Sequence, residues 1–229
     1  MTPDTSIYLH IPFCVHRCAY CDFNTYTAEE IGSSVRRDTF HEVLAQEIRQ
    51  AAPALAGRPV DTVFVGGGTP TLLPIDLLED LLRSIGKQVR VAVLEEFTVE
   101  ANPATVDDAK ARLLVDSGVS RVSMGAQSFH VGELATLERL HCPDDIAPSV
   151  ATLRRNGVGQ INLDLIFGIP GQTMATWLES LRRAIELGPD HIACYGLTYE
   201  PATRLTAQKN TNRLTPCDED LEAEMFLAT

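Results

Sequence analysis

Three cysteines near the start of the chain carry the strongest chemical signal in the sequence. Cys14, Cys18 and Cys21 have the spacing C-x3-C-x2-C within the stretch "HIPFCVHRCAYCDF". Thiolates bind zinc and iron–sulfur clusters, and a structural zinc site normally closes with four ligands. The other three cysteines are distant in sequence and do not repeat this spacing. Three thiolates on a four-iron cluster leave one iron open, so the pattern predicts a metal site that also binds a small ligand.

Two other interpretations of the cysteines remain open from the residues alone. A zinc-stabilised domain without a catalytic role would use the same thiolates. Incidental or buried thiols that bind no metal are the simplest alternative. Iron and sulfide content separates these cases, because a colourless protein that binds zinc would exclude the iron–sulfur cluster.

The elements that must position the cysteines follow an alternating pattern. Apolar runs rich in β-forming residues predict strands at residues 6–13, 60–67, 95–102, 121–128, 160–168 and 191–198. Amphipathic helices are predicted between them, with Leu44, Leu81 and Trp177 on apolar faces and with Leu181 and Ile185 on the face of Trp177. Such alternation predicts an α/β fold with a parallel sheet and helices outside it.

Each predicted strand ends in a segment of unusual composition. After the cysteines, these segments are "GGGTPT" (66–71), "EANP" (100–103), "GAQSF" (125–129), "GIPGQT" (168–173) and "LTYEPAT" (197–203). In parallel α/β barrels the active site lies at the carboxyl ends of the strands. The sequence therefore predicts that six loops converge on one functional face.

The cysteine spacing resembles that of the radical S-adenosylmethionine (SAM) superfamily. The stretches "IYLHIPFC", "GGGTPT", "RVSMGAQSF", "INLDLIFGIPGQT" and "YGLTYEPAT" resemble the branch that contains oxygen-independent coproporphyrinogen III oxidase and the heme chaperone HemW. The resemblance implies a partial (β/α)6 TIM-like barrel as one radical SAM core domain over residues 1–229. It also implies a [4Fe–4S] cluster on Cys14, Cys18 and Cys21, with SAM on the open iron. One electron would then cleave the sulfonium of SAM to a 5′-deoxyadenosyl radical.

The resemblance also implies which residues bind the cofactor. The positions that match SAM or cluster contacts are Tyr8, Tyr20, Gly67, Gly68, Thr69, Glu100, Gln127, Arg139, Asp164 and Thr198. Gln127, Arg139 and Asp164 serve a second SAM molecule in the oxidase. The residues alone leave structural roles without a cofactor open: a strand-to-helix turn for the glycines, a cap or salt bridge for Glu100, a solvated helix face for Arg139 and core packing for the tyrosines.

One position separates the two relatives within this branch. The oxidase carries a further cysteine two residues after the third cluster cysteine, whereas Phe23 stands there in this chain. The resemblance therefore favours a HemW-type chaperone that accepts heme as cargo and delivers it to respiratory hemoproteins. It implies reduced flavodoxin or ferredoxin as electron donor and a homodimer. The oxidase, or another radical SAM enzyme of porphyrin metabolism, is the alternative.

The end of the sequence departs from the chaperone pattern. The chaperone has a further C-terminal domain with a His-Asn-x-x-Tyr-Trp stretch implicated in heme handling, and the 229 residues contain no such stretch. The tail "CDEDLEAEMFLAT" predicts a helix still in progress where the sequence stops. We therefore expect a C-terminally truncated chain that lacks this domain.

Composition narrows the classes of partner and compartment. The formal net charge of −12 disfavours non-specific binding to nucleic acid, which depends on lysine and arginine. We find no apolar run of the ~20 residues that a membrane span requires. The first residues lack the basic and apolar segments of a secretory signal, so we expect a cytoplasmic protein with reduced thiols.

Overall fold

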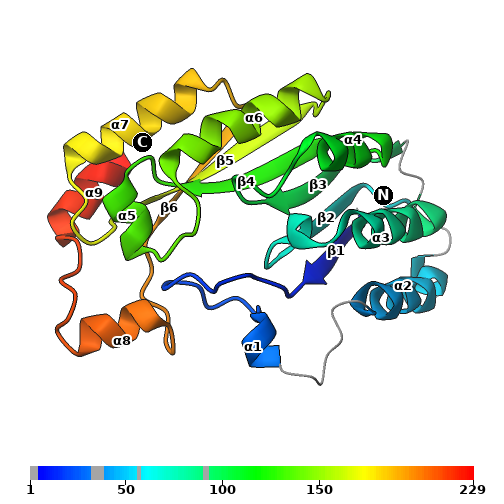
Figure 1. Cartoon of the computed structure of the whole chain (residues 1–229), viewed down its shortest axis with the longest axis horizontal. Coiled ribbons are helices and arrows are strands. Elements are labelled where there is room, and N and C mark those ends of the chain that lie inside the picture. The colour runs from blue at the N-terminus through cyan, green and yellow to red at the C-terminus, as the bar shows by residue number, and fades with distance from the viewer. Residues whose placement is uncertain (1–4, 32–38, 56–57, 90–92) are drawn as a thin grey trace.

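One parallel sheet forms the centre of the molecule (Figure 1). The computed structural model describes residues 5–31, 39–55, 58–89 and 93–229. The strands are β1 (Ser6–Ile11), β2 (Thr62–Gly67), β3 (Glu96–Ala101), β4 (Arg121–Gln127), β5 (Gln160–Phe167) and β6 (His191–Gly196). Neighbouring strands pair in parallel, and their order in the sheet is their order in the chain. The six strands predicted from the sequence are confirmed, with ends that shift by a few residues.

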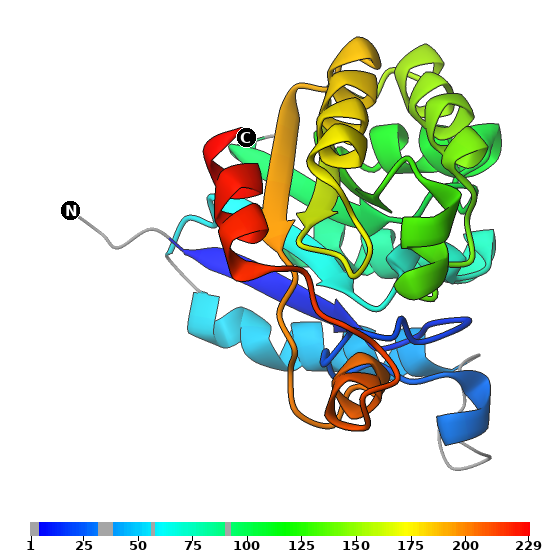
Figure 2. The ribbon, with the colours of Figure 1, turned by 90° about the vertical axis from the view of Figure 1, so that its left-hand side faces the viewer.

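Helices connect the strands and cover the outer face of the sheet. The α-helices are α1 (Ala28–Ile31), α2 (Phe40–Ala51), α3 (Ile75–Gln88), α4 (Asp108–Asp116), α5 (Val131–Thr136), α6 (Ile146–Arg155), α7 (Met174–Glu186), α8 (Arg204–Asn210) and α9 (Glu219–Leu227). Short 3-10 turns are η1 (Ala52–Leu55), η2 (Pro70–Leu72) and η4 (Pro143–Asp145). In Figures 1 and 2, α3, α4, α6 and α7 lie on the same side of the sheet, and α2 packs beside α3.

The two faces of the sheet differ in chemistry because strand side chains alternate between them. In β3, Phe97 and Val99 are almost fully buried and belong to the main apolar core under the helices. Thr98 and Glu100 point to the opposite face, where they form hydrogen bonds with polar partners. The outer face is therefore an apolar core, and the inner face is a polar lumen.

The barrel is open on one side. Within the described residues, β1 pairs with β2 alone and β6 pairs with β5 alone, so these two strands are the edges of the sheet. Figure 2 shows them as the dark blue and the orange strand. This arrangement confirms the predicted α/β class and is consistent with a partial (β/α)6 barrel.

The apolar helix faces agree with the prediction in α3 and differ from it in α7. Four aliphatic side chains of α3 are at most 2% exposed: Leu78, Leu81, Leu82 and Ile85. In α7, Trp177 is fully buried, and its indole N–H donates to the Met225 carbonyl at 3.1 Å. Ile185, expected on the same face, is 64% exposed. Eight residues turn a helix roughly 80° beyond two full turns, which carries Ile185 away from the sheet.

The sequence analysis also expects reduced thiols and no membrane-spanning helix. All six cysteines are free thiols. In the part of the chain that the structure describes, no helix combines the length and the apolar character needed to cross a membrane.

Candidate functional site

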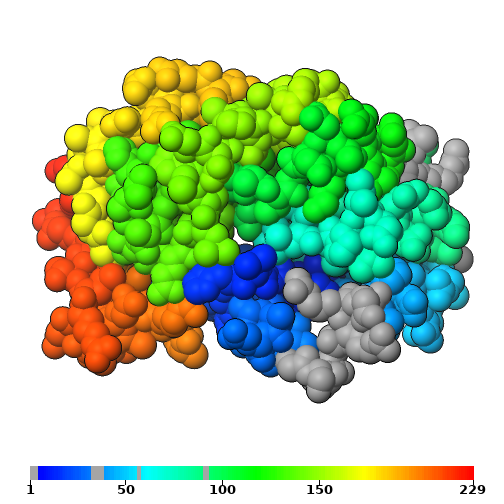
Figure 3. Space-filling model, in the orientation of Figure 1, coloured from blue at the N-terminus to red at the C-terminus, as the bar shows by residue number. Residues whose placement is uncertain are grey.

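The three cysteines lie on a loop that follows β1, here called the cysteine loop (residues 12–26). At its middle, the Ala19 amide donates to the Leu137 carbonyl at 3.0 Å, and the Ala19 carbonyl accepts from the Leu205 amide at 2.8 Å. Ala19 is fully buried in a second apolar cluster with Leu137 and Leu205. In Figure 3, this dark blue segment reaches the surface next to the green residues around α5. The loop is thus tied to elements far away in the chain.

An ion-pair group holds the same loop at the surface. Glu138 Oε2 lies 2.5 Å from Arg204 Nη2 and 3.1 Å from His16 Nε2. The Arg204 guanidinium also donates to the Arg17 carbonyl and, at 2.9 Å, to His16 Nε2. Glu138 follows α5 and Arg204 begins α8, so this group joins both helices to the cysteine loop.

Replacing Arg204 with alanine is expected to loosen the cysteine loop while the domain stays folded. Partly exposed ion pairs contribute at most about 1 kcal/mol, so amide hydrogen exchange in residues 16–21 should accelerate roughly fivefold. Hydrogen-exchange mass spectrometry measures this rate. Arg182→Ala is the matched control, because Arg182 forms an exposed ion pair with Glu186 within α7. Wild-type exchange in the loop of Arg204→Ala would show that the ion pair does not hold it.

The three thiols are half-buried, and their donor set fits a cluster. Burial raises the pKa of Cys14 and of Cys21, so both must lose a proton to bind metal. Among the described residues, no three His, Cys, Asp or Glu side chains are placed to hold one metal ion together. A [4Fe–4S] cluster places its thiolates on separate irons. Cys14, Cys18 and Cys21 on one loop are therefore suited to a cluster with three protein ligands.

A guanidinium lies against the second cysteine of the loop. Arg139 Nη1 donates to Cys18 Sγ at 3.4 Å. Its Nη2 donates to Asn102 Oδ1 at 2.5 Å and to the Gly125 carbonyl at 2.7 Å. Sequence reasoning does not single out Asn102, although the residue belongs to the "EANP" segment that ends β3. The role of Arg139 toward SAM stays a prediction.

The "GGGTPT" segment, here called the glycine loop, packs against the start of the cysteine loop. The Gly68 amide donates to the Ile11 carbonyl at 2.7 Å, and the Thr69 amide donates to the Phe13 carbonyl at 2.9 Å. A Cβ atom on Gly68 would lie 2.4 Å from the Phe13 carbonyl oxygen, so this approach requires glycine. Gly67 has a φ of +112°, which also favours glycine. The two loops therefore form one packed unit.

Glu100 is a partly buried carboxylate on the lumen face. Burial raises its pKa to about 7, the Gly67 amide opposes this shift, and the negative charge of Asp164 adds to it. The Gly67 amide donates to Glu100 Oε2 at 2.9 Å. A carboxylate that is costly to ionise in this place would be stabilised by a nearby cation. The expected contact of Glu100 with SAM, which carries a sulfonium and an ammonium, stays a prediction.

A hydrogen-bonded network lines the lumen around Asp164. Asn162 Nδ2 donates to Asp164 Oδ1 at 2.7 Å and to Ser123 Oγ at 2.8 Å. Ser123 Oγ donates to Asp164 Oδ2 at 3.3 Å, and His191 Nδ1 lies 2.5 Å from Asn162 Oδ1. Burial raises the pKa of Asp164, and the Asn162 and Ser123 hydrogen bonds lower it. The sequence analysis omits Ser123, Asn162 and His191; polar residues at alternate strand positions were the available signal.

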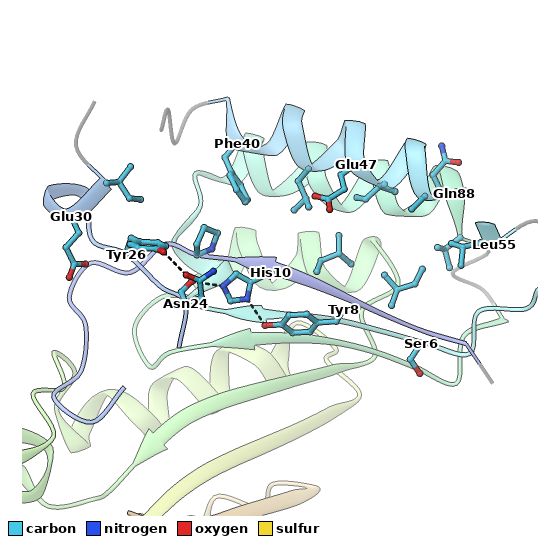
Figure 4. Close-up of a pocket in the computed structure, with 18 residues that line it drawn as sticks. Ser6, Tyr8, His10, Asn24, Tyr26, Glu30, Phe40, Glu47, Leu55 and Gln88 are labelled. Carbon is cyan, nitrogen blue, oxygen red and sulfur yellow. Dashed lines mark hydrogen bonds between the residues drawn. The ribbon is translucent and has the colours of Figure 1, made fainter. Parts of the chain in front are cut away.

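Tyr8 and His10 lie at the free edge of β1, beside a groove that Figure 4 shows. Tyr8 Oη lies 2.9 Å from His10 Nδ1, and His10 Nε2 lies 2.8 Å from the Asn24 carbonyl. A carbonyl only accepts, so His10 Nε2 carries a proton and donates to the Asn24 carbonyl. The groove has a volume of about 890 Å³ and runs between β1 and α2. Its described lining contains no Arg or Lys to neutralise an anionic ligand.

Three other expected cofactor positions have different surroundings. Gln127 is 8% exposed and lies at a β-bulge with a φ of +63°, and bulges re-aim side chains next to active sites. Tyr20 packs against the apolar cluster of Ala19, and its pKa is raised by burial and by Cys18. Thr198 follows β6 and is exposed. Their roles toward SAM stay predictions.

A family model and curated relatives both match most of this chain. The Radical SAM superfamily model matches residues 8–184. The chain is 38% identical to the heme chaperone HemW of Haemophilus influenzae over 203 residues, which cover 88% of this chain and 53% of that protein. It is 37% identical to HemW of Mycobacterium tuberculosis over 220 residues, which cover 96% of this chain and 56% of that protein.

A solved structure has a similar fold over almost the whole chain. The coproporphyrinogen III oxidase HemN from Escherichia coli, described as a radical SAM enzyme, matches with a TM-score of 0.82 and 27% identity. The match covers 98% of this chain and 51% of HemN. The chain thus spans about half the length of the relatives it matches.

Proposed function

Because the chain belongs to the radical SAM superfamily, we propose that it binds a [4Fe–4S] cluster and SAM as the core of a HemW-type heme chaperone. The observation that carries the proposal is the placement of three half-buried thiols, Cys14, Cys18 and Cys21, on one loop beside Arg139 and the polar lumen. When both groups are bound, the cluster supplies the electron for cleavage of SAM.

The residues of the chain bind and orient these groups. The three thiolates would each hold one iron of the cluster, and the fourth iron would stay open for SAM. Glu100 offers a carboxylate to the cationic part of SAM. The close packing of Gly68 against the Phe13 carbonyl holds the glycine loop against the cysteine loop. The apolar cluster around Ala19 keeps water from one side of the cysteine loop.

Heme as the cargo is supported by the likeness to HemW proteins and by Phe23. The HemW proteins of Haemophilus influenzae and Mycobacterium tuberculosis are 38% and 37% identical to this chain. Phe23 is 60% exposed and stands where the oxidase branch carries a further cysteine. The whole chaperone would work in the cytoplasm and would deliver heme to respiratory hemoproteins. Reduced flavodoxin or ferredoxin would be its electron donor, and a homodimer would be its working form.

Electron paramagnetic resonance tests the cofactor part of this proposal. The protein is reconstituted anaerobically with iron and sulfide, reduced, and measured with and without SAM. A reduced-cluster signal that SAM shifts supports the open iron. A complete cluster signal that ignores SAM would contradict SAM binding. Heme binding and transfer to an apo-hemoprotein, followed by absorption, test the cargo, and a chain that binds no heme cannot be the heme-carrying part.

Oxidase activity is the second candidate, because the match to HemN covers 98% of the chain at a TM-score of 0.82. The reaction would be the oxidative decarboxylation of coproporphyrinogen III. Anaerobic incubation of the reconstituted protein with SAM, a reductant and coproporphyrinogen III separates the two functions. Turnover in this assay would replace the chaperone proposal.

A further inference from the structure

Asn102 connects the glycine loop to the cysteine loop through its side chain. Its Nδ2 donates to Thr69 Oγ1 at 2.7 Å, and its Oδ1 accepts from Arg139 Nη2 at 2.5 Å. A guanidinium has donors only, so the amide oxygen must face Arg139 and the amide nitrogen must face Thr69. Arg139 Nη1 in turn donates to Cys18 Sγ at 3.4 Å. A continuous hydrogen-bonded chain therefore runs from Thr69 through Asn102 and Arg139 to Cys18.

The backbone amide and carbonyl of Asn102 both form hydrogen bonds with the Thr105 side chain. The Asn102 amide donates to Thr105 Oγ1 at 3.2 Å, and Thr105 Oγ1 donates to the Asn102 carbonyl at 2.6 Å. Thr105 Oγ1 also lies 2.7 Å from Thr71 Oγ1 in the glycine loop. This turn holds the backbone position from which the Asn102 side chain reaches Arg139.

The two hydrogen-bond acceptors of Arg139 Nη2 carry no net charge. The two oxygen atoms that Arg139 Nη2 contacts belong to an amide side chain, that of Asn102, and to the backbone of Gly125. Both are neutral, so they orient the guanidinium without cancelling its charge. A charge-assisted hydrogen bond from a cation to a thiolate is stronger than one from a neutral donor.

We propose that Asn102 is a positioning residue that holds Arg139 against Cys18 and thereby raises the reduction potential of the cluster. The inference rests on the proposed function, because it requires the cluster on Cys18. Reduction adds an electron, so positive charge and hydrogen bonds at a cluster sulfur favour the reduced form. Through Thr69, the same chain joins the glycine loop to a cluster ligand.

Asn102→Leu tests the inference, because it preserves the approximate size of the side chain and removes both hydrogen-bonding atoms. We expect the equilibrium constant for cluster reduction to fall about tenfold, which equals about 59 mV for one electron. The midpoint is measured by a redox titration followed by electron paramagnetic resonance, without SAM and at wild-type iron and sulfide content. Arg139→Gln should lower the midpoint by at least as much.

The double variant distinguishes a positioning role from a general structural one. Asn102 acts through Arg139, so Asn102→Leu combined with Arg139→Gln should have the midpoint of Arg139→Gln alone. Additive shifts, or an unchanged midpoint in fully loaded Asn102→Leu, would overturn the inference. If the reconstituted wild-type protein forms no cluster, the proposed function fails instead.

Two further variants complete the test. Asn156→Leu is the matched control, because Asn156 caps the carboxyl end of α6, bonds to Asp108 and Thr152, and should leave the midpoint unchanged. Asn102→Asp decides the question if Asn102→Leu fails to load the cluster. It keeps an acceptor for Arg139 and cancels the guanidinium charge, so its midpoint should also fall, and an unchanged or higher value would overturn the inference.

Discussion

A chain in which Cys18 is replaced by serine is expected to hold no stable [4Fe–4S] cluster after anaerobic reconstitution. The substitution removes one of only three thiolates on the cysteine loop and the sulfur that Arg139 contacts. Thiolates are the ligands that hold these clusters, and a hydroxyl group does not replace them at neutral pH. Iron and acid-labile sulfide analysis should find about four of each per wild-type chain and almost none in Cys18→Ser.

The control for this prediction is Cys142→Ser. Cys142 is an exposed free thiol at the start of η4, outside the cysteine loop. Its replacement should leave iron and sulfide at the wild-type level. A Cys18→Ser protein with wild-type iron content would show that the cluster uses other ligands, and zinc in place of iron in the wild type would favour a structural metal site.

The stability of the domain is expected to fall as the pH rises from about 4.5 toward 8, through Glu100. Burial raises the pKa of Glu100 from 4.5 to about 7, so the folded state keeps a proton in this window that the unfolded chain has lost. The contribution of protonated Glu100 to the free energy of unfolding is complete below the pKa that Glu100 has in the unfolded chain. It is lost as the pH rises through the pKa that Glu100 has in the folded protein. The shift corresponds to at most about 3 kcal/mol, reduced by the partial exposure of the side chain.

Glu100→Gln should remove this part of the pH dependence, because glutamine carries no charge to bury. Urea unfolding of both proteins at pH 5, 6, 7 and 8 measures the difference in the free energy of unfolding. The variant should gain stability relative to the wild type as the pH rises. Glu224→Gln makes the same charge change at an exposed site of α9 and should keep the wild-type slope. Parallel curves for wild type and Glu100→Gln would refute the prediction.

Much of the fold could be predicted from local patterns. The run "VDTVFVGG" predicts a strand because it is rich in β-branched residues and glycines end it, and β2 occupies Thr62–Gly67 within it. The apolar spacing around Leu81 predicts a buried helix face, which α3 has. The prediction is wrong for Ile185, because the spacing i, i+4, i+8 drifts around a helix, and local sequence does not show where the covering surface ends.

The candidate site was predictable where its residues lie close together in the chain. The cysteines fall within one loop, so their spacing alone indicates a metal site. The contact between Asn102 and Arg139 joins positions 37 residues apart, and no local pattern encodes it. The network around Asp164 spans three strands and is equally invisible to periodicity.

The sequence by itself determined which thiols are available as ligands, the alternation of strands and helices, and the unusual segments at the carboxyl ends of the strands. Short-range order is sufficient for these properties, because residue type, spacing and turn chemistry act over a few neighbours. Only the tertiary structure decided how Ala19 and Arg204 hold the cysteine loop, which guanidinium lies on Cys18, and how strongly burial shifts Glu100. These properties depend on distances between residues far apart in the chain and on the water excluded when they meet.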